Sequence, residues 1–329
     1  MSVPRQRLIV EPDDGLEPVR EFIASAQSTL LIKQFTFTEP SLIDETIARH
    51  RAGVQVRVML NAKRSGGDRA NDETHEQLRS AGIDVQWSNP AFYVTHEKSI
   101  VVDGKAAMVA TYNLMLKYFT LTRDYGIITY EPEHISQIID VFNADWEHIE
   151  FTPAHDAGLL WSNSNSRLQM ARFIDRATET LLVQHPKFVD AVILDRLADA
   201  ADRGVKIKVL CGGKHGISDW DILDTFSSLR TLRRFGVKVR KQKNLRVHAK
   251  LIIVDGREAL VGSMNIDRSA FDLRRELGII VDDPRIVDRL RSVFKSDWKS
   301  SHRYEAPDPL GHAEQVEDDF PHDHDLVHE

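Results

Sequence analysis

The sequence predicts an α/β fold made of two pseudo-twofold-related α/β/α units, each a mixed β-sheet flanked by helices. Three observations lead to this fold class: an internal repeat at an offset of 151–152 residues, an alternation of strand and helix patterns, and an Asp-Gly hairpin signal in each copy. The 329 residues then divide into a first unit at 1–160, a second unit at 161–304 and an acidic tail at 305–329.

The repeat covers most of the chain. TLLI at 29–32 returns as TLLV at 180–183, at an offset of 151. The longest match joins HEKSIVVDGKAAMVATYN at 96–113 to HAKLIIVDGREALVGSMN at 248–265, at an offset of 152. Similarity at a nearly constant offset indicates two copies of one structural unit, so both copies should fold alike.

The elements of each copy follow from residue patterns in chain order. β-Branched and aliphatic runs bounded by turn residues predict strands, and longer periodic stretches between them predict helices. In the first copy the expected order is a strand at 29–37, a helix at 41–51, a strand at 54–60 and a helix at 72–81, followed by more strands. Because the later strands form a hairpin, we expect mixed sheets rather than parallel ones.

Each copy contains a hairpin whose turn is expected at Asp-Gly, residues 103–104 and 255–256. A two-residue turn there makes His96 face Thr111 and makes His248 face Ser263, with Lys250 opposite Val261. Because side chains two positions apart share one face of a strand, two matching sets should converge on one side of the sheet. The two sets are His96, Lys98, Thr111 and Asn113, and His248, Lys250, Ser263 and Asn265.

These residue types are suited to a phosphodiester. Lysines supply point charges for phosphate oxygens, and amide and hydroxyl groups can donate to a five-coordinate transition state. One neutral imidazole can attack phosphorus, and a second, protonated imidazole can donate a proton to the leaving oxygen. Asp124 and Glu276, each eleven residues after the asparagine of its copy, are candidates to orient the rings. The lysines provide the charge, so we expect no metal and no cofactor.

The two turn aspartates, Asp103 and Asp255, have the opposite parity to the histidines and lysines. We therefore expect them to hold the turn or a neighbouring group rather than to contact substrate. Packing of a core can explain shared apolar residues and glycines, but not two copies of His, Lys, Asp and Asn at the same internal spacing. The repeat thus favours a functional site between the two halves.

The motifs resemble the signature of the phospholipase D superfamily, H-x-K-x4-D followed by G-S/T-x-N. Both copies carry His, Lys and Asp at this spacing, at 96–103 and 248–255. Gly262-Ser263-Met264-Asn265 completes the second motif, whereas Ala110 replaces the glycine of the first. The resemblance covers about 28–146 and 179–298 and implies one site at the interface of two units. It also implies a covalent phosphohistidine, with His96 as nucleophile, His248 as general acid and Asp103 and Asp255 as members of the catalytic motifs.

The substrate remains open between two classes at this point. The segment GSMNIDRSAFDLRRELGIIV at 262–281 resembles bacterial cardiolipin synthase and related phospholipase D-like proteins. Our first hypothesis is therefore metal-independent hydrolysis or alcohol transfer of a phosphatidyl group. The alternative is a nuclease of the same superfamily that acts on DNA or RNA. A third possibility is a non-catalytic binding module that retains the fold.

Charge is distributed unevenly along the chain. The net charge is −7, but nine acids and no Lys or Arg lie at 305–329, so 43 cations face 41 acids in the rest. The stretch 225–254 holds nine cations and no acid, which suits a phosphate-bearing partner such as a lipid surface or a nucleic acid. We expect the tail, which contains His312, His322, His324 and His328, to be disordered.

Composition also bounds the setting in which the protein works. The single cysteine excludes a disulfide framework, and no apolar run is long enough for a transmembrane helix. We expect a cytoplasmic protein with no secretory leader, in peripheral contact with a membrane if the substrate is a lipid. Because both motifs lie in one chain, a monomer should form the complete site.

Overall fold

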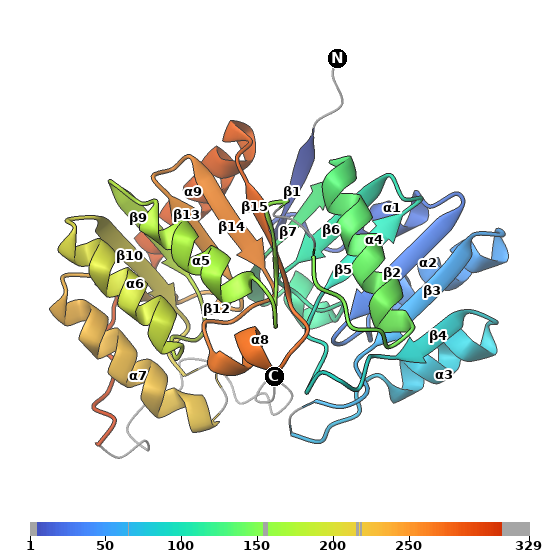
Figure 1. The fold of residues 1–329 in the computed structure, drawn as a ribbon, viewed down its shortest axis with the longest axis horizontal. Helices are drawn as coiled ribbons and strands as arrows, with labels where there is room; N and C mark the ends of the chain where they lie inside the picture. Colours follow the sequence, from blue (N-terminus) through green and yellow to red (C-terminus); the bar gives the residue numbers. More distant parts are fainter. Residues whose placement is uncertain (1–4, 65, 154–156, 215–216, 218, 311–329) are drawn as a thin grey trace.

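The computed structural model describes residues 5–310 apart from 65, 154–156, 215–216 and 218. Figure 1 shows two α/β halves side by side, with the first and second repeat copies on opposite sides. The first copy forms β1 (Gln6–Glu11), α1 (Glu17–Ala24), β2 (Thr29–Gln34), α2 (Pro40–Arg51), β3 (Gln55–Leu60), α3 (Asp72–Ser80), β4 (Asp84–Trp87), β5 (Ser99–Val102), β6 (Ala106–Ala110), the 3₁₀ helix η1 (Leu116–Phe119), β7 (Thr122–Thr129) and α4 (Pro132–Trp146).

The second copy repeats this order. Its elements are β8 (Leu159–Trp161), α5 (Ser166–Asp175), β9 (Thr180–Gln184), α6 (Ala191–Asp202), β10 (Lys206–Cys211), α7 (Asp219–Arg234), β11 (Lys238–Lys241), β12 (Arg246–Val247), β13 (Leu251–Val254), β14 (Glu258–Gly262), α8 (Arg268–Asp272), β15 (Leu277–Val281), α9 (Pro284–Ser300) and β16 (His302–Arg303). The expected strand and helix alternation is therefore confirmed. Strand β8 joins the second sheet, which thus includes residues on both sides of the expected division at 160.

Acidic caps and prolines define where several of the helices begin. Asp190 accepts the backbone N–H of Ile193 at the start of α6, and Glu39 accepts that of Leu42 at the start of α2. Pro40 and Pro284 occupy the first turn of α2 and α9, where a missing N–H leaves no helical hydrogen bond unmade. These local signals set the residues at which α2, α6 and α9 begin.

Both sheets are mixed, as the sequence predicted. The first has the order β1-β7-β6-β5-β2-β3-β4, with β12 of the second copy paired to β7, and the second has the order β16-β11-β10-β9-β13-β14-β15-β8. Strands β2, β3 and β4 are parallel, whereas β5, β6, β7 and β1 are antiparallel, and the second sheet repeats the pattern. Strand β12 therefore belongs to the second copy in sequence but to the sheet of the first copy in the structure.

A shared apolar core holds the two halves together. Helices α1 to α3 cover the outer face of the first sheet, and α5 to α7 cover that of the second, each over its own core (Figure 1). The third core contains buried side chains of both sheets with those of α4 and α9, among them Tyr125, Phe142, Leu251 and Leu290. Burial of apolar surface thus stabilises one interface between the copies.

The hairpin register differs from the prediction by one residue. The Asp-Gly turn is present, because Asp103 and Asp255 have φ angles of 54° and 50° and a glycine follows each in the same left-handed region. One further residue, Lys105 or Arg257, follows the turn before pairing resumes, so Val102 pairs with Ala106 and Val254 with Glu258. Lys250 consequently lies opposite Gly262, not Val261.

Two further observations concern the whole described chain. No helix within it combines the length and apolar character needed to cross a bilayer. The tail was predicted to be disordered, and its part with His312, His322, His324 and His328 lies outside the described residues.

Candidate active site

The two histidine segments lie just before β5 and β13, where each runs against the other half. The backbone N–H groups of His96 and Glu97 donate to the carbonyl of Arg275 at 2.9 Å. In the same way those of His248 and Ala249 donate to the carbonyl of Arg123. Each histidine is therefore positioned by the opposite copy, His248 by the start of β7 and His96 by the segment just before β15.

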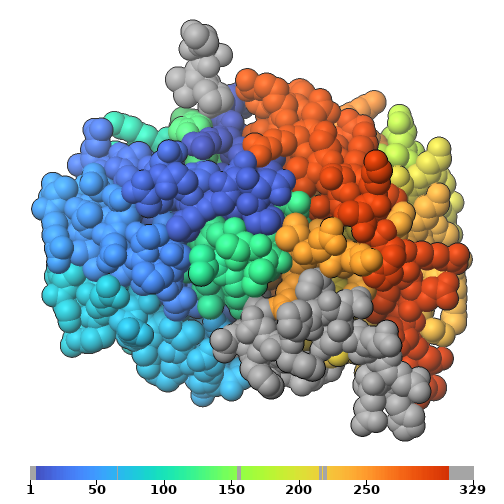
Figure 2. Space-filling view, turned by 180° about the vertical axis from the view of Figure 1, so that it is seen from behind, coloured from blue at the N-terminus to red at the C-terminus, as the bar shows by residue number. Residues whose placement is uncertain are grey.

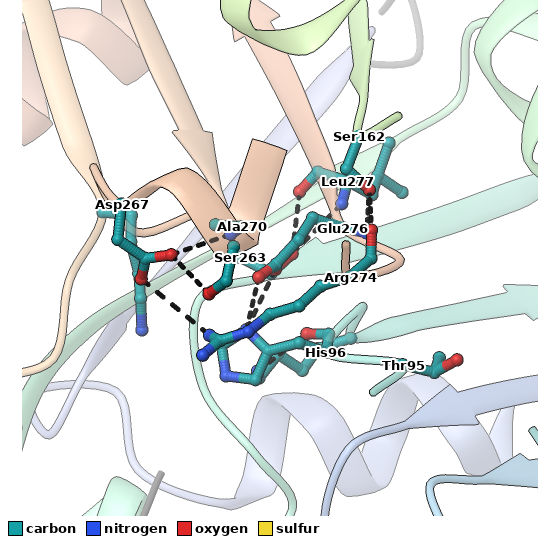
Figure 3. Close-up of polar contacts among 12 residues, drawn as sticks. Thr95, His96, Ser162, Ser263, Asp267, Ala270, Arg274, Glu276 and Leu277 are labelled. Atoms are coloured by element: carbon teal, nitrogen blue, oxygen red, sulfur yellow. Dashed lines mark hydrogen bonds and ion pairs between the residues drawn. The ribbon is translucent and has the colours of Figure 1, made fainter. Parts of the chain in front are cut away.

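The carboxylates orient the histidines crosswise between the halves. His96 Nδ1 lies 3.0 and 2.9 Å from the two oxygens of Glu276 (Figure 3). His248 Nδ1 lies 2.6 Å from Asp124 Oδ1. A carboxylate at Nδ1 fixes the tautomer that leaves the Nε2 lone pair available. His96 and His248 are only 1% and 6% exposed, so these contacts lie in a nearly water-free environment.

The two Nε2 atoms have different surroundings. Nε2 of His96 has no hydrogen-bond partner among the described residues. His248 Nε2 instead lies 2.8 Å from Lys250 Nζ, while Lys98 Nζ donates to the backbone carbonyl of His96 at 2.8 Å. The structure thus brings the four His and Lys residues of both motifs together in one site. The wrong prediction of the hairpin register did not affect this outcome, because these residues precede the regularly paired strands.

Thr111 and Ser263 bond groups of the protein itself, and their expected donation to phosphate stays a prediction. Thr111 Oγ1 donates to Asp124 Oδ1 at 2.5 Å and accepts the N–H of Tyr125. The Ser263 hydroxyl bonds the backbone of Leu277 and supports the charged form of Glu276. Both hydroxyls therefore hold the orienting carboxylate of their own copy, and Asn113 and Asn265 are buried.

Asp103 and Asp255 bind backbone rather than the site. Asp103 accepts the N–H groups of Gln27, Ser28 and Thr29 at the start of β2. Asp255 accepts those of residues 178–180 at the start of β9. These hydrogen bonds lower the pKa of both carboxyls, and they fasten each hairpin to the neighbouring strand.

Burial dominates the titration of the site. Burial, reinforced by Lys98 and Arg274, holds the pKa of His96 well below its ordinary value. Burial lowers the pKa of His248 to about 3, although Asp124 opposes this effect, and the pKa of Lys250 is also lowered well below its usual value. Burial raises the pKa of Glu276 to about 7, whereas His248 and Lys250 lower that of Asp124 against its burial. Both imidazoles are thus neutral at pH 7 without substrate.

Three buried residues near the site escaped the sequence argument: Arg274, Lys187 and His185. Arg274 and Lys187 contact Asp267 at 4.0 and 3.7 Å, and Lys187 also pairs with Asp221. His185 is fully buried near Lys250, which together with burial lowers its pKa to about 3. An offset comparison of the copies would have found them, because the first copy has Thr122, Thr36 and Gln34 in these places.

The basic stretch at 225–254 does not form one uncompensated surface. Arg230 pairs with Asp308 at 3.3 Å, and Arg233 pairs with Glu305 at 2.8 Å. Lys250 belongs to the buried site instead of the surface. The first acids after α9 thus neutralise part of the stretch that the sequence predicted to attract a polyanion.

The chain matches the family described as cardiolipin synthase, PLD-like domain, over residues 19–146 and 170–298. It is 27% identical to the major cardiolipin synthase of Bacillus subtilis over 301 residues, which are 80% of this chain and 61% of the relative. It is 26% identical to a cardiolipin synthase of Oceanobacillus iheyensis, over 79% of this chain and 60% of that protein. The chain therefore spans about three fifths of the length of these relatives.

Solved structures show the same fold. A phosphatidylserine synthase from Haemophilus influenzae superposes with a TM-score of 0.75 at 14% identity, over 95% of this chain and 90% of that one. A polyphosphate kinase from Porphyromonas gingivalis superposes with a TM-score of 0.73 at 17% identity, over 92% and 48% of the two chains. At such identities the likeness establishes the arrangement of two units and nothing about the substrate.

Proposed function

We propose, from the premise that this chain belongs to the PLD-like domain family of cardiolipin synthases, that it transfers or hydrolyses a phosphatidyl group through a phosphohistidine. One observation carries the proposal: two buried histidines, each held at Nδ1 by a carboxylate of the other half, share one site with two buried lysines. The similarity to cardiolipin synthases favours a phospholipid over a nucleic acid.

His96 is the nucleophile in this proposal. Its Nε2 has no partner among the described residues, whereas the Nε2 of His248 is already engaged by Lys250. In the first step Nε2 of His96 forms a bond to phosphorus, and the bond from phosphorus to the leaving alcohol oxygen breaks. Glu276, at Nδ1, stabilises the positive charge that the phosphorylated ring acquires.

The His248–Lys250 pair is the general acid. The 2.8 Å contact between Lys250 Nζ and His248 Nε2 lets the two groups share one proton, so they titrate as a pair. A phosphodiester anion bound between the lysines raises the proton affinity of the pair, which then protonates the leaving oxygen. In the second step an alcohol or water gives its proton to the pair, its oxygen bonds to phosphorus, and the P–N bond breaks.

Exposed apolar side chains close in sequence to the site residues support a lipid interface, and we call Leu116, Leu121 and Leu273 the apolar rim. Leu121 and Leu273, 47% and 53% exposed, each precede an orienting carboxylate by three residues. The Leu273 carbonyl accepts the N–H of exposed Tyr93, and Leu116 lies exposed in η1, whose Tyr118 ring packs on His248. Figure 2 shows the green segment near residue 120 and the orange segment near residue 245 side by side between the two halves, where β12 pairs with β7. We infer that this rim makes the peripheral membrane contact of a monomeric enzyme, whose buried site receives the headgroup.

The decisive experiment traps the covalent intermediate. Purified protein is mixed with ³²P-phosphatidylglycerol vesicles, with ³²P-labelled single-stranded DNA or with bis(p-nitrophenyl) phosphate, and is then quenched in base. We expect label from the lipid on the wild type, slower labelling of His248→Gln because both steps use the His248–Lys250 pair, and none in His96→Gln. His75→Gln, which alters a histidine stacked on Trp87 in the first half, is the matched control. Labelling of His96→Gln, or turnover of DNA alone, would contradict the proposal, and no turnover of any substrate would favour a binding module.

The interface inference has its own test. The double variant Leu121→Ser, Leu273→Ser should bind phosphatidylglycerol vesicles at least about 10-fold more weakly, because each leucine loses its transfer from water to lipid. The ratio of vesicle turnover to bis(p-nitrophenyl) phosphate turnover should fall with it. The control is the double variant Leu168→Ser, Val192→Ser. It alters one leucine on α5 and one valine on α6, both of similar exposure to the rim leucines. Equal vesicle binding by both double variants would place the membrane contact elsewhere.

A further inference from the structure

Arg274 breaks the pseudo-twofold symmetry of the site. It lies two residues before Glu276, and the residue at the same place in the first copy is Thr122. Thr122 supports the carboxylate of its own copy, since its hydroxyl donates to Asp124 Oδ2 at 2.6 Å. Arg274 makes no such contact with Glu276, so the duplication has produced a different function at this position.

The guanidinium of Arg274 is buried but poorly paired. The residue is 4% exposed, and its Nε has no hydrogen-bond partner among the described residues. Its ion pair with Asp267 is 4.0 Å long, at the limit of such a contact, while the other oxygen of Asp267 caps α8. A buried guanidinium without acceptors is costly, which indicates that an anion completes its contacts when the site is in use.

The backbone fixes where this guanidinium lies. The Arg274 carbonyl accepts the hydroxyl of Ser162, and its N–H donates to Ser269 in α8. The following residue, Arg275, bonds the backbone of Val94 and of His96. Figure 3 shows the side chain of Arg274 extending toward His96 and Asp267. Its charge acts on His96 more strongly than that of any other group except Lys98.

We propose that Arg274 binds a non-bridging oxygen of the phosphoryl group carried by His96, as a third cation that only the nucleophile's side of the site possesses. This proposal rests on the proposed function. Lys98 and Lys250 belong to the two symmetric motifs and would flank the phosphorus, whereas the fork of an arginine suits the oxygens of a phosphate. Arg274 is unchanged by the reaction: the P–N bond forms at His96, the leaving oxygen takes its proton from the His248–Lys250 pair, and Arg274 balances the remaining negative charge in both steps.

The test compares Arg274 with its chain neighbour. Arg275 is equally buried, but its guanidinium pairs with Asp145 at 2.8 Å, which makes Arg275→Gln the matched structural control. Arg274→Gln should lose about 10- to 100-fold in kcat/KM on bis(p-nitrophenyl) phosphate, the effect of one charge-assisted hydrogen bond. Its melting temperature should stay at or above that of the wild type, whereas Arg275→Gln should lower it. Arg274→Lys should recover part of the loss.

Two further measurements separate contact with phosphate from a structural role. The Arg274 charge lowers the pKa of both His96 and Glu276, so without it the acid limb of kcat/KM should move to higher pH in Arg274→Gln but not in Arg275→Gln. Binding of inorganic phosphate, measured by calorimetry, should weaken by a similar factor, and this readout needs no turnover. An unlabelled wild type would refute the proposed function and leave the phosphate titration to decide on Arg274. Unchanged phosphate binding and an unmoved acid limb in Arg274→Gln would overturn the inference.

Discussion

Replacing Glu11 by glutamine should stabilise the protein at neutral and alkaline pH. The Glu11 side chain is fully buried at the end of β1, opposite Asp124, and no side chain among the described residues donates a hydrogen bond to its oxygens. Burial, with the charges of Asp124 and Asp14, raises its pKa from 4.5 to about 9. The folded protein therefore holds a proton on this carboxyl that the unfolded chain releases above pH 4.5.

The magnitude follows from proton linkage. Because the folded state binds one proton more than the unfolded state, the free energy of unfolding falls as pH rises between 4.5 and about 9. The slope is about 1.4 kcal/mol for each pH unit, so the carboxyl costs about 3 kcal/mol of stability at pH 7. Glutamine has nearly the same volume and leaves similar polar atoms without partners, so the comparison isolates ionisation.

Urea unfolding of the wild type and Glu11→Gln from pH 5 to 9, followed by tryptophan fluorescence, checks this. The two free energies of unfolding should nearly coincide at pH 5 and separate steadily toward pH 9, with the variant more stable. Parallel curves across this range would refute the reasoning, because they would show that Glu11 ionises alike in the folded and unfolded chains. Glu17→Gln, which removes an exposed carboxylate on α1, controls for the change in net charge.

The remaining predictions concern the motif aspartates, the crosswise carboxylates and the interface. Asp255→Asn should lower the free energy of unfolding by about 1–3 kcal/mol, because several backbone hydrogen bonds at the start of β9 weaken, yet the folded fraction should retain kcat on bis(p-nitrophenyl) phosphate. Asp124→Asn should lose less activity on bis(p-nitrophenyl) phosphate than on phospholipid, because the nitrophenolate leaving group needs little protonation. Glu276→Gln should lose activity on both substrates. The wild-type rate should also fall as pH drops through about 7, since Glu276 then gains a proton, and a flat profile there would contradict its role. Arg123→Gln should cost about 3–5 kcal/mol in calorimetry, because it leaves buried Asp297 without its charge partner.

The repeat made most of the fold predictable. One alignment of the copies placed strands, helices and both hairpins, because duplicated sequence must bury the same faces in each copy. The hairpin register was predicted wrongly by one residue, since the Asp-Gly signal sets the turn but not whether Lys105 or Arg257 joins the strand after it. This error did not affect the prediction of the site, because His96 and His248 precede the paired strands.

The partners of the histidines could not be predicted from one sequence. Spacing identified Asp124 and Glu276 as carboxylates near the site, but it could not say which ring each would hold. That choice depends on tertiary contacts, namely the pairing of the 246–249 segment with β7 and the bonds from His96 to Arg275. Arg274 could not be predicted from the repeat, because the repeat singles out residues that the copies share and the first copy has Thr122 in its place.

The crosswise arrangement makes the site and the interface one cooperative unit. Arg123 and Arg275, next to Asp124 and Glu276 in sequence, form buried ion pairs with Asp297 of α9 and Asp145 of α4. A relative shift of the halves would break these pairs, the backbone bonds of both histidine segments and both imidazole–carboxylate contacts together. Turnover of bis(p-nitrophenyl) phosphate and tryptophan fluorescence should therefore be lost at the same urea concentration. If activity disappeared at lower urea, the carboxylates would be held by a local element that opens before the interface does.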